Sequence, residues 1–113
     1  MDGCIFCKIV KGELPSKKVY EDESIVAFES IQPVAETHLL ICPKLHIESF
    51  EKIDKNFDLL SLVYAAQKII EKNKLGGGYK LVFNGGKYQS IPHLHWHLLA
   101  GELEGNGDAV NKT

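Results

Sequence analysis

The chain has 113 residues, and its 13 Lys and Arg against 15 Asp and Glu give a formal net charge of −2. This length allows one domain and excludes two independent cores. The basic residues are scattered, which argues against a binder of polymeric nucleic acid, and no apolar run approaches the roughly 20 residues of a membrane span. The N-terminus lacks the basic and apolar regions of a signal peptide. We therefore expect a single domain over residues 1–113 that is cytoplasmic, and also nuclear if the source is a eukaryote.

The first half of the chain is predicted to form a short helix followed by three strands. In residues 4–11, Ile5, Phe6 and Ile9 have helical spacing, and a glycine then ends the turn. Strand-like runs follow at 18–21, 25–31 and 37–43. The polar residues 21–24 predict a hairpin turn between the first two runs.

The second half contains one long helix and two more strands. Residues 55–74 carry a stripe at helical spacing made of Leu59, Val63, Ala66 and Ile70, with Asp54 as the expected N-cap. Strands are predicted at 79–84 and 93–100, after a run of three glycines. Strands before and after a single long helix indicate an α+β domain built on an antiparallel sheet. Its core is expected over 4–101, with 102–113 as a flexible polar tail.

The three cysteines, Cys4, Cys7 and Cys42, do not fit a disulfide framework, because their number is odd and the context is not secretory. The Cys4-x-x-Cys7 spacing leaves two interpretations, a redox couple or half of a zinc site. No strand precedes the pair, which argues against a thioredoxin-like couple. Cys42 lies in an apolar run and is expected to be a small buried side chain.

The strongest functional pattern is the run His93-Leu94-His95-Trp96-His97. In a strand, alternate side chains share one face about 6.6–6.8 Å apart, so three imidazoles would line one side while the intervening apolar residues are buried on the other. Imidazole suits a neutral nucleophile, a proton carrier or a metal ligand near neutral pH.

Two chemistries suit this histidine row, namely metal binding and covalent catalysis in which one imidazole attacks phosphorus. Asn84 and two glycines, then Gln89 and Ser90, precede the row. They offer amide, hydroxyl and backbone N–H donors, which suit phosphate oxygens better than an enclosed metal.

The row His-X-His-X-His-X-X resembles the signature of the histidine triad superfamily. The rest of the chain is similar to its nucleoside phosphoramidase branch, the histidine triad nucleotide-binding proteins, from about residue 4 to residue 101. The matching segments are Cys4-Ile5-Phe6-Cys7-Lys8-Ile9, Ala27-Phe28, Ile31-Gln32-Pro33, Thr37-His38, Pro43-Lys44-Leu45-His46-Ile47, Asn84 and Gln89-Ser90.

The resemblance implies a homodimer of five-stranded sheets that hydrolyses the P–N bond of purine nucleoside 5′-phosphoramidates. His95 would attack the α-phosphorus and form a nucleotidyl-histidine, which water would cleave. His97 and Ser90 would contact the phosphate oxygens and the leaving group, and His38 would support the row. The nucleotide, AMP or a phosphoramidate, would also be held by these residues: Ile5, Phe6, Ile9, Phe28, Ser30, Ile31, Asn84 and Gln89.

Two features depart from the family pattern. Ser30 stands where the family usually has an Asp that binds the ribose hydroxyls, and strand alternation points the adjacent Glu29 to the other face. The segment from Asn84 to His93 is also shorter than usual. We therefore expect weak recognition of the ribose and a tighter phosphate loop.

The resemblance also implies one structural zinc, held by Cys4, Cys7, His46 and His93 as a Cys₂His₂ set, with no organic cofactor. The alternative is that both cysteines are reduced and packed as hydrophobic residues.

Three functions remain open at this stage. The favoured one is the phosphoramidate hydrolase, and the second is a nucleotide-binding or scaffold protein with weak activity. The third is a zinc hydrolase that uses the histidine row as metal ligands.

Overall fold

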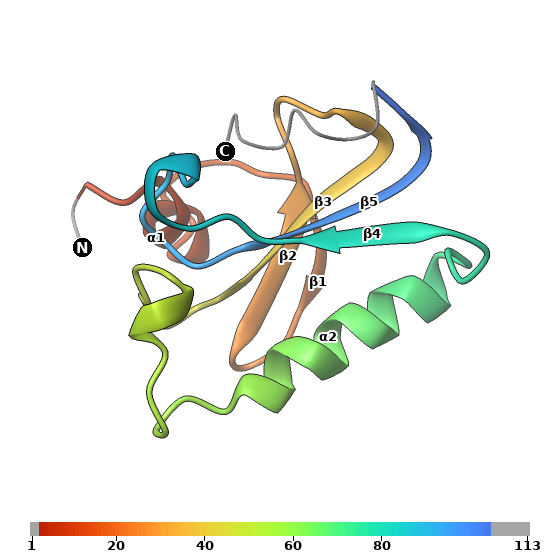
Figure 1. Cartoon of the computed structure of the whole chain (residues 1–113). Helices are drawn as coiled ribbons and strands as arrows, with labels where there is room; N and C mark the ends of the chain where they lie inside the picture. Colours follow the sequence, from red (N-terminus) through yellow and green to blue (C-terminus); the bar gives the residue numbers. More distant parts are fainter. Residues whose placement is uncertain (1–2, 105–113) are drawn as a thin grey trace.

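A computed structural model describes residues 3–104. It contains one five-stranded antiparallel sheet with the strand order β1-β2-β3-β5-β4 (Figure 1). The strands are β1 (Lys18–Glu21), β2 (Ile25–Glu29), β3 (Ala35–Pro43), β4 (Tyr79–Val82) and β5 (Trp96–Leu103). The helices are α1 (Ile5–Val10) and α2 (Leu59–Lys72), with single 3₁₀ turns at Phe50–Lys52 and Gly86–Tyr88. The predicted α+β class, with five antiparallel strands, one long helix and one short helix, is confirmed.

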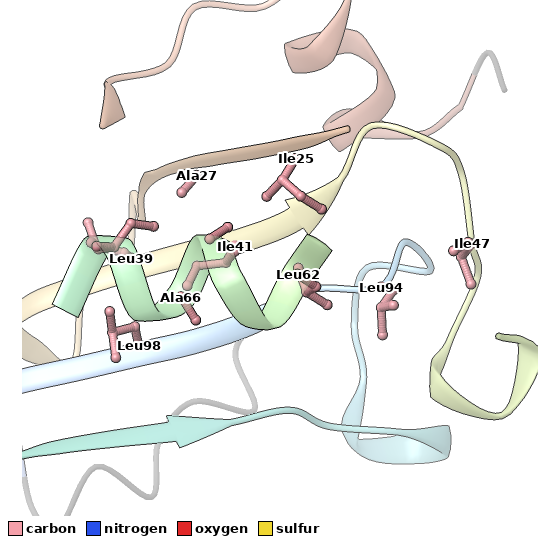
Figure 2. Packing of buried hydrophobic residues seen from close by; sticks show 11 residues of the cluster. Ile25, Ala27, Leu39, Ile41, Ile47, Leu62, Ala66, Leu94 and Leu98 are labelled. Atoms are coloured by element: carbon pink, nitrogen blue, oxygen red, sulfur yellow. The ribbon is translucent and has the colours of Figure 1, made fainter. Parts of the chain in front are cut away.

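The main core lies between one face of the sheet and α2. Alternate residues of the central strands, among them Ile25, Ile41 and Leu98, are fully buried there against Leu62 and Ile69 of the helix (Figure 2). Fully burying one such aliphatic side chain contributes roughly 1.5–3 kcal/mol. This core fixes β3 and β5 side by side, and both strands carry histidines of the predicted site.

The opposite face of the sheet packs against α1. Phe6 and Ile9 of this short helix are buried against Val26 and Phe28 of β2 and Leu40 of β3. Because side chains alternate along a strand, these residues come from positions between those that face α2. The described part of the chain has no helix long and apolar enough to cross a membrane.

The long helix begins later than expected. Asp58, not Asp54, is its N-cap and accepts a hydrogen bond from the Leu60 N–H at 3.1 Å. Asp54 instead accepts from the Asn56 N–H at 2.8 Å in a separate turn. The buried stripe of the helix overlaps the predicted one only at Ala66. Leu59 is 38% exposed, and the other buried positions are Leu62, Ala65 and Ile69.

Several strand limits also differ from the prediction. β2 ends at Glu29, β3 already begins at Ala35, and β4 ends at Val82. β5 extends to Leu103, because Leu103 pairs with Ala35 across the sheet, so residues 102 and 103 belong to the fold and not to the tail. The remainder of the predicted tail, 105–113, lies outside the described residues.

Candidate active site

The histidine row lies on the α1 face of the sheet, at the point where β5 begins. His93 and His95 precede β5 and only His97 is within it, which corrects the prediction that the strand starts at His93. The Leu94 N–H donates to the Ile47 carbonyl at 2.6 Å, so the segment is held by a loop and not by the strand ladder. The segment is nevertheless extended, because its side chains alternate. Leu94 packs in the α2 core, while the three imidazoles are buried on the other side.

The ring of His95 is fixed by a main-chain carbonyl and by two neighbouring rings. Its Nδ1 lies 2.7 Å from the His93 carbonyl oxygen. A carbonyl can only accept, so Nδ1 carries the proton and a neutral ring has an unprotonated Nε2. The ring centroid lies 5.0 Å from that of Phe6 and 5.0 Å from that of His97. His95 therefore has an unprotonated Nε2 in a ring of fixed orientation.

His97 is held in the opposite tautomer by a short chain of hydrogen bonds. The Val34 N–H donates to His38 Nδ1 at 3.0 Å, so His38 carries its proton on Nε2. That N–H faces His97 Nδ1 at 2.9 Å and donates to it. Neutral His97 then has its proton on Nε2.

Both supporting histidines are neutral near pH 7. Burial, with a smaller contribution from nearby His95, lowers the pKa of His38 to about 4. Burial also lowers the pKa of His97 to about 3, with added effects of His95 and His38. Adjacent imidazoles thus offer an unprotonated nitrogen and an N–H, which suits a nucleophile next to a hydrogen-bond donor.

A mostly apolar cavity of about 610 Å³ opens beside the row, between α1 and β2. It brings together six of the residues that the sequence assigned to nucleotide binding: Ile5, Phe6, Ile9, Phe28, Ser30 and Ile31. Ile31 is 93% exposed and Ile5 is 50% exposed, so these two side chains have no core to fill. An apolar slot open to solvent suits a flat, apolar ligand group.

The loop from Asn84 to Ser90 leads into the histidine row. It contains the 3₁₀ turn Gly86–Tyr88, and Gly86 has a φ of 59°, a conformation that favours glycine. Asn84 is half-buried and Ser90 is exposed. Gln89 is turned toward main-chain carbonyls of neighbouring segments.

Next to the row, the side chains of Cys4, Cys7, His46 and His93 converge. Their ligand atoms all lie within 4.8 Å of one another. Cys4 Sγ is 3.3 Å from His93 Nδ1, and Cys7 Sγ is 3.2 Å from His46 Nδ1. Tetrahedral bonds of about 2.3 Å to sulfur and about 2.0 Å to nitrogen would place such atoms about 3.5 Å apart, so the four residues fit a zinc ion.

The proton on His93 lies on the side away from the sulfurs. His93 Nε2 donates to the Pro43 carbonyl at 2.8 Å, which leaves Nδ1 free of a proton in the neutral ring. Burial lowers the pKa of His93 to about 4, so the ring is neutral and able to act as a ligand. Among the described residues this set does not include His95 or His97, which argues against a metal held by the histidine row itself.

Comparison with known proteins identifies the family. Residues 11–103 match the family model of the HIT domain, which is most of the chain. The chain belongs to the HIT family. The solved structure of a HIT family hydrolase from Clostridium thermocellum superposes with a TM-score of 0.85 at 42% identity, covering 89% of this chain and 92% of that one. The α+β fold is therefore the HIT fold.

Three HIT relatives differ in what their names state. An uncharacterized HIT-like protein of Methanocaldococcus jannaschii is 40% identical over 95% of this chain and 84% of its own length. An adenosine 5′-monophosphoramidase of Candida albicans is 38% identical over 96% of this chain and 76% of its own length. A 14 kDa zinc-binding protein of Zea mays is 42% identical over 86% of this chain and 80% of its own length.

Sequence reasoning did not identify one wall of the HIT cavity. Leu14, Pro15, Ser16 and Lys17 line it, although they lie in a turn with no periodic pattern. The only local signal was the pair Leu14-Pro15 within a polar segment. Glu29 also borders the cavity instead of facing fully away from Ser30, because regular alternation ends with β2 at this residue. Its carboxylate pairs with the Lys17 ammonium at 3.1 Å.

Proposed function

We propose that this HIT protein hydrolyses purine nucleoside 5′-phosphoramidates through a nucleotidyl-histidine intermediate. The observation that carries the proposal is the tautomer of His95, whose Nδ1–H is committed to the His93 carbonyl at 2.7 Å. The unprotonated Nε2 is the atom that a nucleophile needs. The names of the adenosine 5′-monophosphoramidase relatives support the same substrate class.

The reaction proceeds in two displacements. His95 Nε2 attacks the α-phosphorus, the P–N bond breaks, and the amine takes up a proton from solvent as it leaves. In the intermediate the imidazole is cationic, and the His93 carbonyl stabilises this charge by accepting from Nδ1–H. Water then attacks the same phosphorus and releases a proton to solvent, the bond between phosphorus and Nε2 breaks, and the nucleotide departs while His95 returns to its neutral form.

The neighbouring groups act on the phosphate and on the nucleoside. His97 donates through Nε2–H to a phosphate oxygen or to the leaving nitrogen, and Ser90 with Asn84 offers further polar contacts. The base enters the apolar cavity beside Phe6 and Phe28. Since the Phe6 ring is also 5.0 Å from that of His95, a base in the cavity lies close to the nucleophile.

A variant at His95 tests this assignment. His95→Ala should abolish phosphoramidase turnover, because no other group replaces the covalent route. His97→Ala should reduce turnover less, since it removes a donor and not the nucleophile. Turnover is measured with an adenosine 5′-phosphoramidate, and circular dichroism checks that each variant is folded. Retention of more than a few per cent of turnover by folded His95→Ala would show that another residue attacks.

A second candidate function is supported by Ser30. Ser30 borders the cavity, and its hydroxyl accepts the Gln32 N–H at 3.2 Å. This position therefore offers a neutral hydroxyl, and not a carboxylate, to the hydroxyls of a ribose. A nucleotide-binding protein with weak hydrolysis would have such a site. The two functions differ in turnover number and not in the residues involved.

We also propose that the Cys₂His₂ cluster holds one structural zinc. The ligand set is Cys4, Cys7, His46 and His93, in line with the names of plant zinc-binding relatives. When bound, the metal would tie α1 to the segments that follow β3 and precede β5. His93 would bind it through Nδ1, because Nε2 of the same ring donates to the Pro43 carbonyl.

A homodimer is proposed from the edge of the sheet at β4. Among the described residues, this edge strand has no neighbour on its outer side in the sheet. It carries two exposed apolar residues, Tyr79 and Leu81, and exposed Phe83 directly follows it. An apolar free edge is a surface that proteins normally cover. A second copy pairing at β4 would cover these apolar side chains.

A further inference from the structure

The side-chain amide of Gln89 is engaged at both of its hydrogens by main-chain carbonyls. Its Nε2 lies 2.8 Å from the Glu48 oxygen and 2.8 Å from the Ile91 oxygen. Both partners can only accept, so the NH₂ end of the amide must point at them. The two N–H donors that the sequence offered to a phosphate are therefore used within the protein.

These two bonds join segments that border the histidine row. The Ile91 carbonyl also accepts the His93 N–H at 2.8 Å, and the Leu94 N–H donates to Ile47 at 2.6 Å. Gln89 thus adds a cross-link from the loop to the segment after His46, at the same place where the row is anchored. Ser90 is the next residue along the chain, so the cross-link fixes the backbone on both sides of it.

Within the described chain, the middle of this loop makes few packing contacts. A side chain added at Gly85 or Gly86 would meet no atom within 4 Å, and Tyr88 is 58% exposed. The loop's internal main-chain bonds at Tyr88 and Gln89 close one short turn without tying it to the sheet. The position of the loop relative to His95 therefore depends on ties such as those of Gln89.

We propose that Gln89 is a positioning residue, which holds the loop from Asn84 to Ser90 so that its donors meet the phosphate of a nucleotide. This inference rests on the proposed function for the identity of the ligand. It predicts an effect on ligands that carry a phosphate and none on the nucleoside alone, because the base slot is built mainly by α1, β2 and the segment before β1.

Two replacements of similar size remove the donors. Gln89→Glu places an anion against two carbonyls, and Gln89→Met keeps the volume without any hydrogen bond. Gln67→Glu is the matched control, since Gln67 is an exposed residue of α2. Calorimetry measures binding of adenosine and of AMP, and hydrogen exchange measures the amides of residues 84–91 in each protein without ligand.

Both Gln89 variants should bind AMP about tenfold more weakly, which matches the loss of roughly one or two hydrogen bonds, while adenosine affinity stays within twofold. Exchange should accelerate at residues 84–91 and not in α2. Unchanged AMP affinity, or equal losses for adenosine and AMP, would overturn the proposal.

Failure of the proposed nucleotide site is recognised separately, because the wild-type protein would then bind no AMP. The positioning role is in that case decided by exchange alone. Faster exchange confined to the loop in both variants supports the cross-link, and unchanged exchange overturns it.

Discussion

His95 and His97 are two residues apart in the sequence, yet they present different atoms to the same site. The tautomer of His95 is set by the His93 carbonyl, and that of His97 is set by His38, which in turn accepts from Val34. The sequence predicted the row and its shared face. The need for a main-chain carbonyl at Nδ1 of His95 was also predictable from the chemistry of a nucleophilic imidazole. The tautomer of His97 was not, because it depends on His38 of β3 and on Val34 in the loop before β3.

Ser30 provides a residue-scale prediction about the sugar. An Asp at this position could accept from the ribose 2′ and 3′ hydroxyls, whereas the Ser30 hydroxyl is already used by Gln32. Wild-type protein should therefore bind AMP and 2′-deoxy-AMP with similar affinity. Ser30→Asp should tighten AMP binding about tenfold, corresponding to about 1.4 kcal/mol, and leave deoxy-AMP nearly unchanged.

Titration calorimetry with both nucleotides on both proteins measures these affinities. If wild-type protein already discriminates strongly against the deoxynucleotide, another residue holds the sugar.

At the scale of single elements, α1 is attached to the rest of the fold in two ways, by apolar packing and by the Cys₂His₂ cluster. Phe6 and Ile9 bury it against the sheet, and Cys4 is at once its N-cap and a member of the Cys₂His₂ cluster. The cap accepts the Cys7 N–H at 3.4 Å. A metal at the cluster would therefore fasten the start of this helix to the histidine row.

Cys4→Ser separates these two roles. Serine is a good N-cap, so the helix keeps its cap while the zinc loses a thiolate ligand. We expect about one zinc per chain in protein purified without chelator, less than half of that in Cys4→Ser and Cys7→Ser, and a lower melting temperature in both. Elemental analysis and calorimetric melting measure the two effects.

Cys42→Ala is the control, since Cys42 is a buried cysteine of the same core that does not belong to the ligand set, and its replacement should not change the zinc content. If wild-type protein purified without chelator contains no zinc, the cluster is not a zinc site.

The ends of the elements show where local patterns are insufficient. Asp54 and Asp58 both precede helix-compatible residues and both cap a turn, but 55–58 contains Asn, Phe and Asp, which have low helix propensity. The apparent strand from His93 fails for another reason. The N–H groups of His93 and Leu94 bond to Ile91 and Ile47, and loop partners of this kind cannot be deduced from periodicity.

For the molecule as a whole, the two edges of the sheet differ in character. β1 carries Lys18 and Glu21, which form an ion pair at 3.6 Å, whereas β4 exposes apolar side chains. Charged edges resist pairing with another chain, and apolar edges favour it. The family resemblance implied a dimer, but the sequence alone did not single out this edge.

Leu81→Asp tests the dimer at β4. The introduced charge should convert the protein to a monomer at concentrations where the wild type is dimeric, as measured by light scattering after gel filtration. Leu45→Asp, at a residue 63% exposed elsewhere, should leave the dimer intact. A wild-type monomer would contradict the proposed interface.

The most direct test of the central claim is the mass of the intact protein shortly after addition of an adenosine 5′-phosphoramidate. Acid-quenched protein is measured by mass spectrometry, and fragmentation locates any added group. We expect the protein mass to increase transiently by one adenylyl group, with that group located on His95. The increase should be absent from His95→Ala and present in the Gln67→Glu control. An adenylyl group on another residue, or turnover in folded His95→Ala protein, would contradict it.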